Sequence, residues 1–339
     1  MQTYQRFLPC VIFFYALLPF NNATSTEPDK VAVAKSLELL RKAAKGHIEM
    51  KSCFGCHNQA FPMLAFSKVK DKNFTIPKEE IEAQTNFIMK FLEINEQKFL
   101  EGAGTGGAAD TAGYALFTLE LAGVKPNQTT NAVVTYLLKH QADNGYWKVT
   151  SNRPPSEASH FTTNFLALRA LRVWGKSNPV ELIEKRRKAA SDWVIKTLPK
   201  TTEDLVFRIL ALQEISFISD KQIVNETLKQ SAKALIDKQN NDGGWAQTEK
   251  MESDPYATAT SLVALHMTGQ VLKNDKVFQE GINYLVKTRK EDGSWLVKSH
   301  SKPFQTYYES GFPHEKDQFI SVTASGWATA AMLISLSDK

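Results

Sequence analysis

Hydrophobic and polar positions follow a helical period along most of this 339-residue chain. Segments such as 31–50 and 85–99 carry apolar residues every three or four positions, which is the pattern of an amphipathic helix with one buried face. A second kind of segment is rich in Ala, Thr, Ser and Gly, so helices there are able to approach closely. The clearest is 256–265, and its counterparts are 110–121, 161–171 and 321–336.

Three segments repeat one plan, in which an amphipathic helix ends, a Gly-containing turn follows, and an aromatic residue comes next. The turns read QADNGYW at 141–147, QNNDGGW at 239–245 and RKEDGSW at 289–295. Glycine supplies the positive φ that such turns require. Trp245 and Trp295 are 50 residues apart. Trp147 precedes Trp245 by 98 residues, which is close to two such periods, so a degenerate copy is expected between Trp147 and Trp245.

That degenerate copy is predicted as a helix over 190–198 and a second helix that Thr201-Thr202-Glu203-Asp204 opens and that runs through Leu212. Earlier copies pair 85–99 with the helix from Asp110, and 31–50 with 61–69. Six helix pairs then fill residues 31–338. We predict one all-α domain, a closed (α/α)6 toroid with the small-residue helices inside. The rival, an open solenoid, requires polar capping helices, which we do not identify.

The N-terminal segment 1–24 is predicted to be a secretory signal peptide. Arg6 precedes an apolar run from Leu8 to Phe20, and cleavage is expected near Ala23. The run of about 13 residues is shorter than the roughly 20 of a spanning helix. An uncleaved anchor is the alternative, and it is the main route by which we expect membrane contact. We therefore expect an exported protein, periplasmic or extracellular.

Cleavage removes Cys10 and leaves two cysteines in one motif, Cys53-Phe54-Gly55-Cys56-His57, within segment 52–63. Two thiols at this spacing reach the two vinyl groups of haem, and the adjacent imidazole ligates iron. The motif predicts a covalent haem c on Cys53 and Cys56 with His57 as axial ligand. A CxxC disulfide or redox pair is the stronger alternative, and a zinc site the weaker, because zinc requires a fourth ligand.

The second axial position of such a haem stays open at this stage. Met63 lies six residues past His57 and leaves little chain to pass around the macrocycle. Residues from elsewhere in the ring reach the opposite face more easily; the candidates are His47, Met50, His160 and Met267.

The net charge of +5 comes from mixed charges without a long basic run, so nucleic acid is not expected as a partner. We expect a redox partner or an apolar small molecule, and only weak attraction to anionic surfaces.

The Gln-x-x-Asp/Asn-Gly-x-Trp copies resemble the QW repeats of squalene-hopene cyclases and related prenyltransferase-like toroids. This resemblance covers most of the mature chain and implies a scaffold role for Gln141, Trp147, Gln239, Trp245 and Trp295, with Arg289 as a departure. A group of secreted bacterial toroids is similar in carrying Cys-x-x-Cys-His-x-Gln at this point. The Asp-x-Asp-Asp acid of the cyclases is absent, and the zinc ligands of the prenyltransferases are not all present. Activity therefore does not follow from the fold.

A toroid of this kind encloses a pocket at the starts of its inner helices. The catalytic candidates there are Asp110, His160, Asp254 and Tyr256, and the other residues expected nearby are Ser159, Thr162, Glu203, Asp204 and Thr323. Helix N-caps are the simpler interpretation of most of the Asp, Ser and Thr residues. Loop 296–319 contains His300, Tyr307, Tyr308 and His314 and is either a lid or a solvated surface loop.

Three functions remain open from the sequence. The first is a haem protein in electron transfer or redox chemistry, with oxidoreductase activity uncertain. The second is a terpenoid cyclase-like or prenyltransferase-like enzyme, which predicts an aromatic-lined cavity with a buried acid. The third is a non-catalytic binding module.

Overall fold

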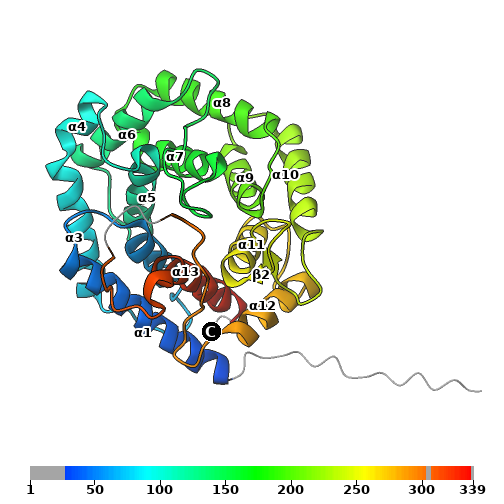
Figure 1. The fold of residues 1–339 in the computed structure, drawn as a ribbon. Coiled ribbons are helices and arrows are strands. Elements are labelled where there is room, and N and C mark those ends of the chain that lie inside the picture. Colours follow the sequence, from blue (N-terminus) through cyan, green and yellow to red (C-terminus); the bar gives the residue numbers. More distant parts are fainter. Residues whose placement is uncertain (1–26, 303–306, 337–339) are drawn as a thin grey trace, which may run out of the picture.

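The computed structural model of the protein describes residues 27–302 and 307–336. The predicted signal peptide, Cys10 and the last residues of the predicted domain lie outside the described residues. In the described part, two concentric rings of helices form the molecule (Figure 1). The outer helices are α1 (Glu27–Met50), α3 (Lys78–Ile94), α6 (Gln128–His140), α8 (Val180–Lys196), α10 (Lys221–Ile236) and α12 (Lys276–Thr288). The inner helices are α2 (Phe61–Phe66), α5 (Ala108–Leu121), α7 (His160–Trp174), α9 (Thr202–Ile215), α11 (Pro255–Met267) and α13 (Gln318–Ser335).

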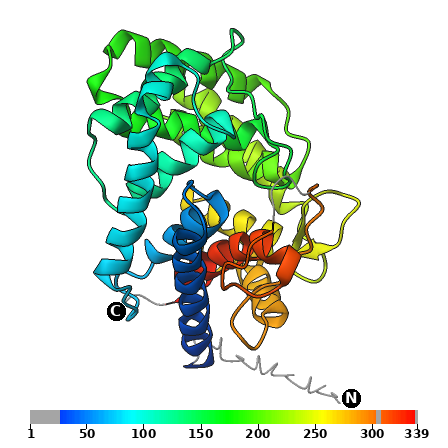
Figure 2. The same ribbon diagram turned by 60° about the vertical axis from the view of Figure 1, so that its left-hand side comes forward.

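The inner helices contact one another in sequence order, and α13 packs against α2 to close the ring. Figure 2 shows the first outer helix, α1, beside the C-terminal α13, which it also contacts. The predicted all-α (α/α)6 toroid is therefore confirmed, and the open solenoid is wrong. No described helix is both long enough and apolar enough to cross a membrane.

The two rings differ in the way that their sequences predict. In α11, residues 257–261 are Ala, Thr or Ser and are at most 1% exposed, so neighbouring helices enclose this helix on all sides. Outer helix α12 instead buries one face, which consists of Phe278, Gly281, Ile282, Tyr284 and Leu285. Burial on all sides needs small residues, whereas one buried face needs only the amphipathic period.

The repeated turns link neighbouring outer helices through the residues to which the resemblance assigned a scaffold role. The Trp245 indole donates to the carbonyl of Leu235 at 2.7 Å, and Trp147 and Trp295 make the same bond to α6 and α12. Gln239 donates to Gly243 of its own turn and to Val277 of the next outer helix, both at 2.9 Å. Each complete copy therefore anchors its own helix and the next one.

The turn glycines are required for two independent reasons. Gly145 and Gly243 have φ values of +95° and +86°, which disfavour residues with a side chain. Each also lies against the next outer helix. An added Cβ would meet the carbonyl oxygen of Ala189 at 2.2 Å or that of Glu280 at 2.4 Å.

The last repeat closes the outer ring without a glutamine. Arg289 replaces it, and closure uses Lys35 of α1, whose ammonium donates to the Glu291 carbonyl at 3.0 Å. Ser36 and Thr329 add a buried hydrogen bond of 2.6 Å between α1 and α13.

The degenerate copy is also confirmed. Its two helices are α8 and α9, and both are longer than the helices predicted over 190–198 and 201–212. It lacks the Gln and Trp. In place of these two residues, the Arg208 guanidinium of α9 donates to the Val194 and Ile195 carbonyls of α8 at 3.1 and 2.7 Å.

The structure differs from the predicted elements in small ways. The helix expected over 85–99 breaks at Asn95 into α3 and α4 (Glu96–Glu101), because the Asn95 side chain donates back to the Phe91 carbonyl. A two-stranded antiparallel ribbon, β1 (Trp245–Ala246) and β2 (Ser253–Asp254), was not expected. Short turns of helix at η1 (Cys56–Ala60), η2 (Gly175–Ser177) and η3 (Glu315–Asp317) complete the described structure.

Candidate functional site

The Cys-x-x-Cys-His motif joins outer helix α1 to inner helix α2 at the mouth of the ring. Cys53 is exposed in the loop, and Cys56 is buried at the start of η1; the two thiols are free. The motif is held from both sides. Gln59 accepts from the Gly55 amide at 3.0 Å and donates to Gln84 of α3 at the same distance.

A cavity of about 800 Å³ lies beside the motif, within the size range of small-molecule and cofactor sites. Cys53, Cys56 and His57 all line it. Its apolar wall includes Phe54, Phe91, Tyr308 and Phe319, and its cationic residues are Lys51, Lys98, Arg153 and Lys302. The sequence motif therefore faces a cavity whose walls are partly apolar and partly cationic.

A buried carboxylate, Glu157, lies beside the motif and was not expected from the sequence. Its side chain is 1% exposed and pairs with Arg153, and one of its oxygens is 3.9 Å from His57 Nε2. A short bridge between Arg153 and Glu157, in the loop before α7, positions the pair. Nothing in the sequence signalled this approach, because a carboxylate in a loop 100 residues after His57 has no local pattern.

The ionisation of the motif follows from burial. Burial, followed by the Glu157 charge, raises the pKa of the Cys56 thiol well above its usual value, so this sulfur stays protonated at neutral pH. Burial lowers the pKa of His57, which favours a neutral imidazole with a free lone pair. A protonated thiol is a poor nucleophile, so Cys56 is not built as an activated catalytic thiolate.

Asp110 of α5 is the predicted candidate that lies nearest the motif. It is 1% exposed, and it accepts from the Thr163 hydroxyl at 2.5 Å, while its second carboxylate oxygen has no hydrogen-bond partner. Burial raises its pKa to about 7. Asp110 is not an N-cap, since no side chain caps α5.

The other predicted pocket residues divide into helix caps and a buried cluster. Asp254 caps α11 and accepts from the Tyr256 and Ala257 amides, and Ser159 caps α7, as the simpler interpretation predicted. The buried cluster consists of Glu203, Thr162 and Tyr256. Glu203 accepts from the Thr162 hydroxyl at 2.8 Å and from the Tyr256 hydroxyl at 2.9 Å.

Two further predicted residues have structural partners of their own. Asp204 accepts from Ser159 at 2.6 Å, and Thr323 donates to the Phe319 carbonyl at 2.9 Å within α13.

Of the two buried acids, Glu203 carries a proton near neutral pH. Burial raises the pKa of Glu203 to about 8 and that of Asp254 to about 6. Neither acid lines the cavity of about 800 Å³ beside the motif. The centre of the ring is packed with aromatic side chains that are at most 4% exposed: Phe61, Tyr114, Phe165, Phe207, Tyr256 and Trp327. Phe61 contacts Tyr114 at 5.5 Å between ring centroids and Trp327 at 6.2 Å.

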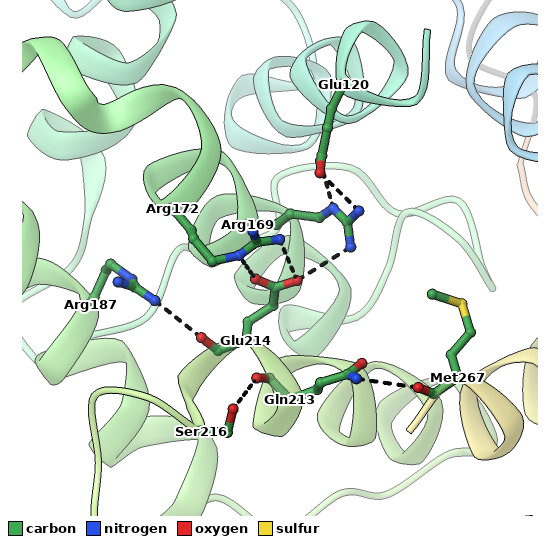
Figure 3. Close-up of polar contacts among 8 residues, drawn as sticks. All are labelled: Glu120, Arg169, Arg172, Arg187, Gln213, Glu214, Ser216 and Met267. Carbon is green, nitrogen blue, oxygen red and sulfur yellow. Dashed lines mark hydrogen bonds and ion pairs between the residues drawn. The ribbon is translucent and has the colours of Figure 1, made fainter. Parts of the chain in front are cut away.

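An ion-pair network joins the C-terminal ends of three inner helices (Figure 3). Arg169 of α7 bonds Glu120 of α5 at 2.6 Å and Glu214 of α9 at 3.3 Å. Arg172 bonds Glu214 at 2.5 Å, and the Arg169 guanidinium lies 5.3 Å from the Phe117 ring centroid. Three inner helices are thereby tied at their C-terminal ends.

Among the candidates for a second axial ligand, His47 alone lines the cavity. Met63 is 2% exposed in the core of α2, and Met50 is 55% exposed. Met267 lies at the C-terminal end of α11, beside the network of Figure 3. His160 Nδ1 accepts from the Val149 amide at 3.1 Å and is not a lining residue. His47 lines the cavity, but both of its nitrogens are bonded to protein atoms.

The described part of loop 296–319 packs against the ring instead of lying free in solvent. Tyr308, Ser310 and Phe312 are at most 8% exposed, while Tyr307 is 49% exposed. His300 and His314 bond Gln247 and Ser294. The loop thus forms a wall of the cavity through Tyr308 and Lys302. Among residues 27–302 and 307–336, no group of three or more His, Cys, Asp or Glu is placed to hold a metal ion by itself.

Comparisons with known proteins find a family model and several solved structures that are similar to this toroid. Residues 204–321 match the model of the squalene-hopene cyclase C-terminal domain. No curated protein sequence matches the chain. A variant of MstE, a type II terpene cyclase from Scytonema, solved with geranylgeranyl dihydroxybenzoate, has a TM-score of 0.58 at 11% identity, over 90% of this chain and 99% of that one.

Two carbohydrate-active toroids are similar as well. The unsaturated glucuronyl hydrolase of Bacillus sp. GL1 has a TM-score of 0.56 at 11% identity, over 78% of this chain and 86% of that one. A polysaccharide lyase has the same TM-score and identity, over 89% and 97%. At these identities the likeness concerns the fold. The chain is thus an α/α toroid whose residues 204–321 match the model of the squalene-hopene cyclase C-terminal domain and whose fold is similar to that of a type II terpene cyclase.

Proposed function

We propose that the protein is an exported toroid that carries a covalent haem c at its mouth and acts in electron transfer or related redox chemistry. The observation that carries the proposal is that both thiols of the motif and the adjacent imidazole line one cavity of about 800 Å³. Export supports it, because residues 1–24 have the pattern of a signal peptide and thioether haem is attached outside the cytoplasm.

The residues of the cavity fit a haem in chemistry as well as in size. Each cysteine S–H would add across one vinyl C=C, the sulfur bonding to one carbon and the hydrogen to the other, so no oxidant is required. His57 would supply the axial nitrogen, since its burial keeps the imidazole neutral. Bound haem would supply one-electron redox chemistry or a ligand-binding iron.

The rest of the cavity would bind the macrocycle without covalent bonds. Phe54, Phe91 and Phe319 provide apolar wall area, and Lys51, Lys98 and Lys302 provide charge for two propionate carboxylates. The partly buried Arg153 is paired with Glu157 and so carries less free charge.

The experiment is expression of the full precursor with and without cytochrome c maturation machinery, followed by denaturing electrophoresis with a haem stain and a pyridine-haemochrome spectrum. We expect colour that stays with the denatured polypeptide only when the machinery is present. A colourless polypeptide from the maturation-competent host contradicts the proposal. Mature N-terminal sequencing in the same preparation tests cleavage near Ala23.

The comparisons favour a second candidate, a haem-free toroid enzyme for an isoprenoid or other apolar substrate. Its acid would be Glu203, which a pKa of about 8 keeps protonated at neutral pH, or Asp254, whose pKa of about 6 keeps it protonated only in mildly acidic solution. The aromatic packing at the ring centre counts against it, because a polyene needs an open cavity and Tyr256, Phe207 and Trp327 fill the space.

A direct assay separates the two candidates. Haem-free protein is incubated with geranylgeranyl-type substrates and the products are analysed by mass spectrometry. Cyclised products that disappear in Glu203→Gln or Asp254→Asn support the enzyme. Unchanged substrate, together with haem staining of the protein made in the maturation-competent host, supports the first proposal.

A further inference from the structure

His47 near the end of α1 is buried, 3% exposed, and makes two hydrogen bonds that the haem proposal leaves unexplained. Its Nε2 lies 2.8 Å from the carbonyl oxygen of Cys53. Its Nδ1 lies 2.7 Å from the hydroxyl of Tyr308, 261 residues further along the chain. The residue therefore links the first cysteine of the motif to the loop before the last helix.

The two bonds define the tautomer of the ring. A carbonyl oxygen only accepts, so Nε2 carries the hydrogen and donates to Cys53. Burial lowers the pKa of His47, which makes the ring neutral and leaves Nδ1 as an acceptor for the Tyr308 hydroxyl. With one nitrogen donating and the other accepting, neither has a lone pair free for iron. This chain of bonds removes His47 from the candidates for a second axial ligand.

The motif is shaped around this ring. A Cβ added at Gly55 would lie 2.4 Å from His47 Cε1 and 2.8 Å from Nε2, so the glycine between the cysteines is required by the histidine beneath it. Phe87 of α3 packs on the same ring at 5.9 Å between centroids.

Tyr308 is itself fixed by its surroundings. The Lys51 ammonium lies 4.3 Å from its ring centroid, and Phe319 packs against it at 5.2 Å. The loop meets α1 so closely that a Cβ at Gly46 would lie 2.2 Å from the Ser310 carbonyl oxygen. The position of Tyr308 is thus a consequence of ring closure.

We propose that His47 is a positioning residue: it holds the Cys53 backbone so that both thiols face the cavity, and Tyr308 transmits ring closure to this contact. The inference rests on the proposed haem function for its purpose. The contact itself is independent of haem and is measurable in the haem-free protein.

The test compares variants that keep one of the two bonds. His47→Gln places an amide N–H where Nε2 stands and retains the donor to Cys53. His47→Asn places its polar atoms at the Nδ1 position and loses that donor. Tyr308→Phe removes only the hydroxyl. His140→Asn is the matched control, because His140 also bonds a backbone carbonyl, that of Gly102, but at the exposed surface and far from the motif in sequence.

The first readout is alkylation of the haem-free full chain by iodoacetamide. Trypsin releases both cysteines in one peptide, 52–68, whose fragmentation reports each thiol separately. Because Cys53 is already exposed and Cys56 is buried, the thiol that reports loosening of the segment is Cys56. Loss of one hydrogen bond to the Cys53 carbonyl should raise the Cys56 rate about fivefold in His47→Asn. We expect His47→Gln and His140→Asn to stay within about twofold of the parent, as a lost bond corresponds to a larger change.

The second readout is the thioether pattern in haem-loaded protein. In His47→Asn we expect a larger fraction with a single thioether at Cys56, and a haemochrome band at longer wavelength, because one vinyl group stays conjugated. Tyr308→Phe should change both readouts in the same direction by a smaller factor, and it keeps the test decisive if His47→Asn does not fold.

Equal Cys56 rates in His47→Gln and His47→Asn, with native circular dichroism in both, would overturn the inference. Equal thioether patterns in the haem-loaded variants would overturn it as well. If the parent takes up no haem, the proposed function fails, and the alkylation rates still decide whether His47 holds Cys53.

Discussion

The buried carboxyl of Glu203 should make the protein less stable as the pH rises through neutrality. Its side chain accepts from Thr162 and Tyr256 at the centre of the ring, and burial raises its pKa from 4.5 to about 8. The folded state therefore retains a proton that the unfolded chain releases above pH 4.5. Unfolding then releases a proton, so the stability from this group is complete below pH 4.5 and is lost as the pH rises towards 8.

The magnitude follows from the linkage relation. One proton released on unfolding changes the free energy of unfolding by about 1.4 kcal/mol per pH unit. Between pH 5.5 and 7.5 the Glu203 contribution is therefore about 3 kcal/mol, a large fraction of the stability of a typical domain. Asp110 and Asp254 contribute in the same direction, because burial raises the pKa values of both, to about 7 and about 6.

Glu203→Gln keeps the shape and an amide able to bond both hydroxyls, but it has no proton to release. We expect the free energy of unfolding of the parent, measured by urea titration, to fall between pH 5.5 and 7.5 by about 3 kcal/mol more than that of the variant. Glu226→Gln, on exposed α10, is the control and should keep the slope of the parent. Parallel pH curves for the parent and Glu203→Gln would refute the reasoning.

Three further predictions concern the scaffold and are checked by chemical denaturation. Gln239→Ala removes one bond within its own turn and one to α12, and should cost about 2 kcal/mol, against less than about 0.5 kcal/mol for the exposed Gln222→Ala; equal losses would contradict a stabilising role for these bonds. Gly145→Ala meets both a φ of +95° and a carbonyl oxygen at 2.2 Å, so it should cost more than about 3 kcal/mol, whereas Gly123→Ala, at φ +77° in open space, should cost about 1 kcal/mol. Arg169→Met leaves buried Glu214 with fewer partners and should cost about 3 kcal/mol; an unchanged midpoint would show that the network of Figure 3 adds nothing.

The ring was predictable from sequence because its signals are local and repeated. The helical period, the small-residue helices and the Gly-Trp turns each recur, so a copy with missing residues is recognised by its place in the series. Arg208 shows the limit of that approach. It replaces the missing Gln and Trp of the degenerate copy by bonding two carbonyls, and no pattern in the sequence assigns it that role.

The candidate site was predictable only where its residues are adjacent in sequence. Cys53, Cys56 and His57 form one motif, and the structure puts all three beside one cavity. Glu157 and Tyr308 reach the motif through ring closure, from 100 and 251 residues after His57, so only the three-dimensional structure reveals them. The catalytic candidates expected at the starts of the inner helices, Asp110, His160, Asp254 and Tyr256, do not line this cavity. Their distance from it depends on the packing of aromatic side chains at the ring centre, which has no local pattern in the sequence.

The most direct test of a haem-bearing mouth is mass spectrometry of peptide 52–68 from denatured, trypsin-digested protein made in a maturation-competent host. We predict that this single peptide carries the full mass of haem with no loss of hydrogen, that Cys53→Ser and Cys56→Ser each retain it through one thioether, and that the double variant carries none. An unmodified peptide, or one that has lost two hydrogens through a Cys53–Cys56 disulfide, would contradict the account.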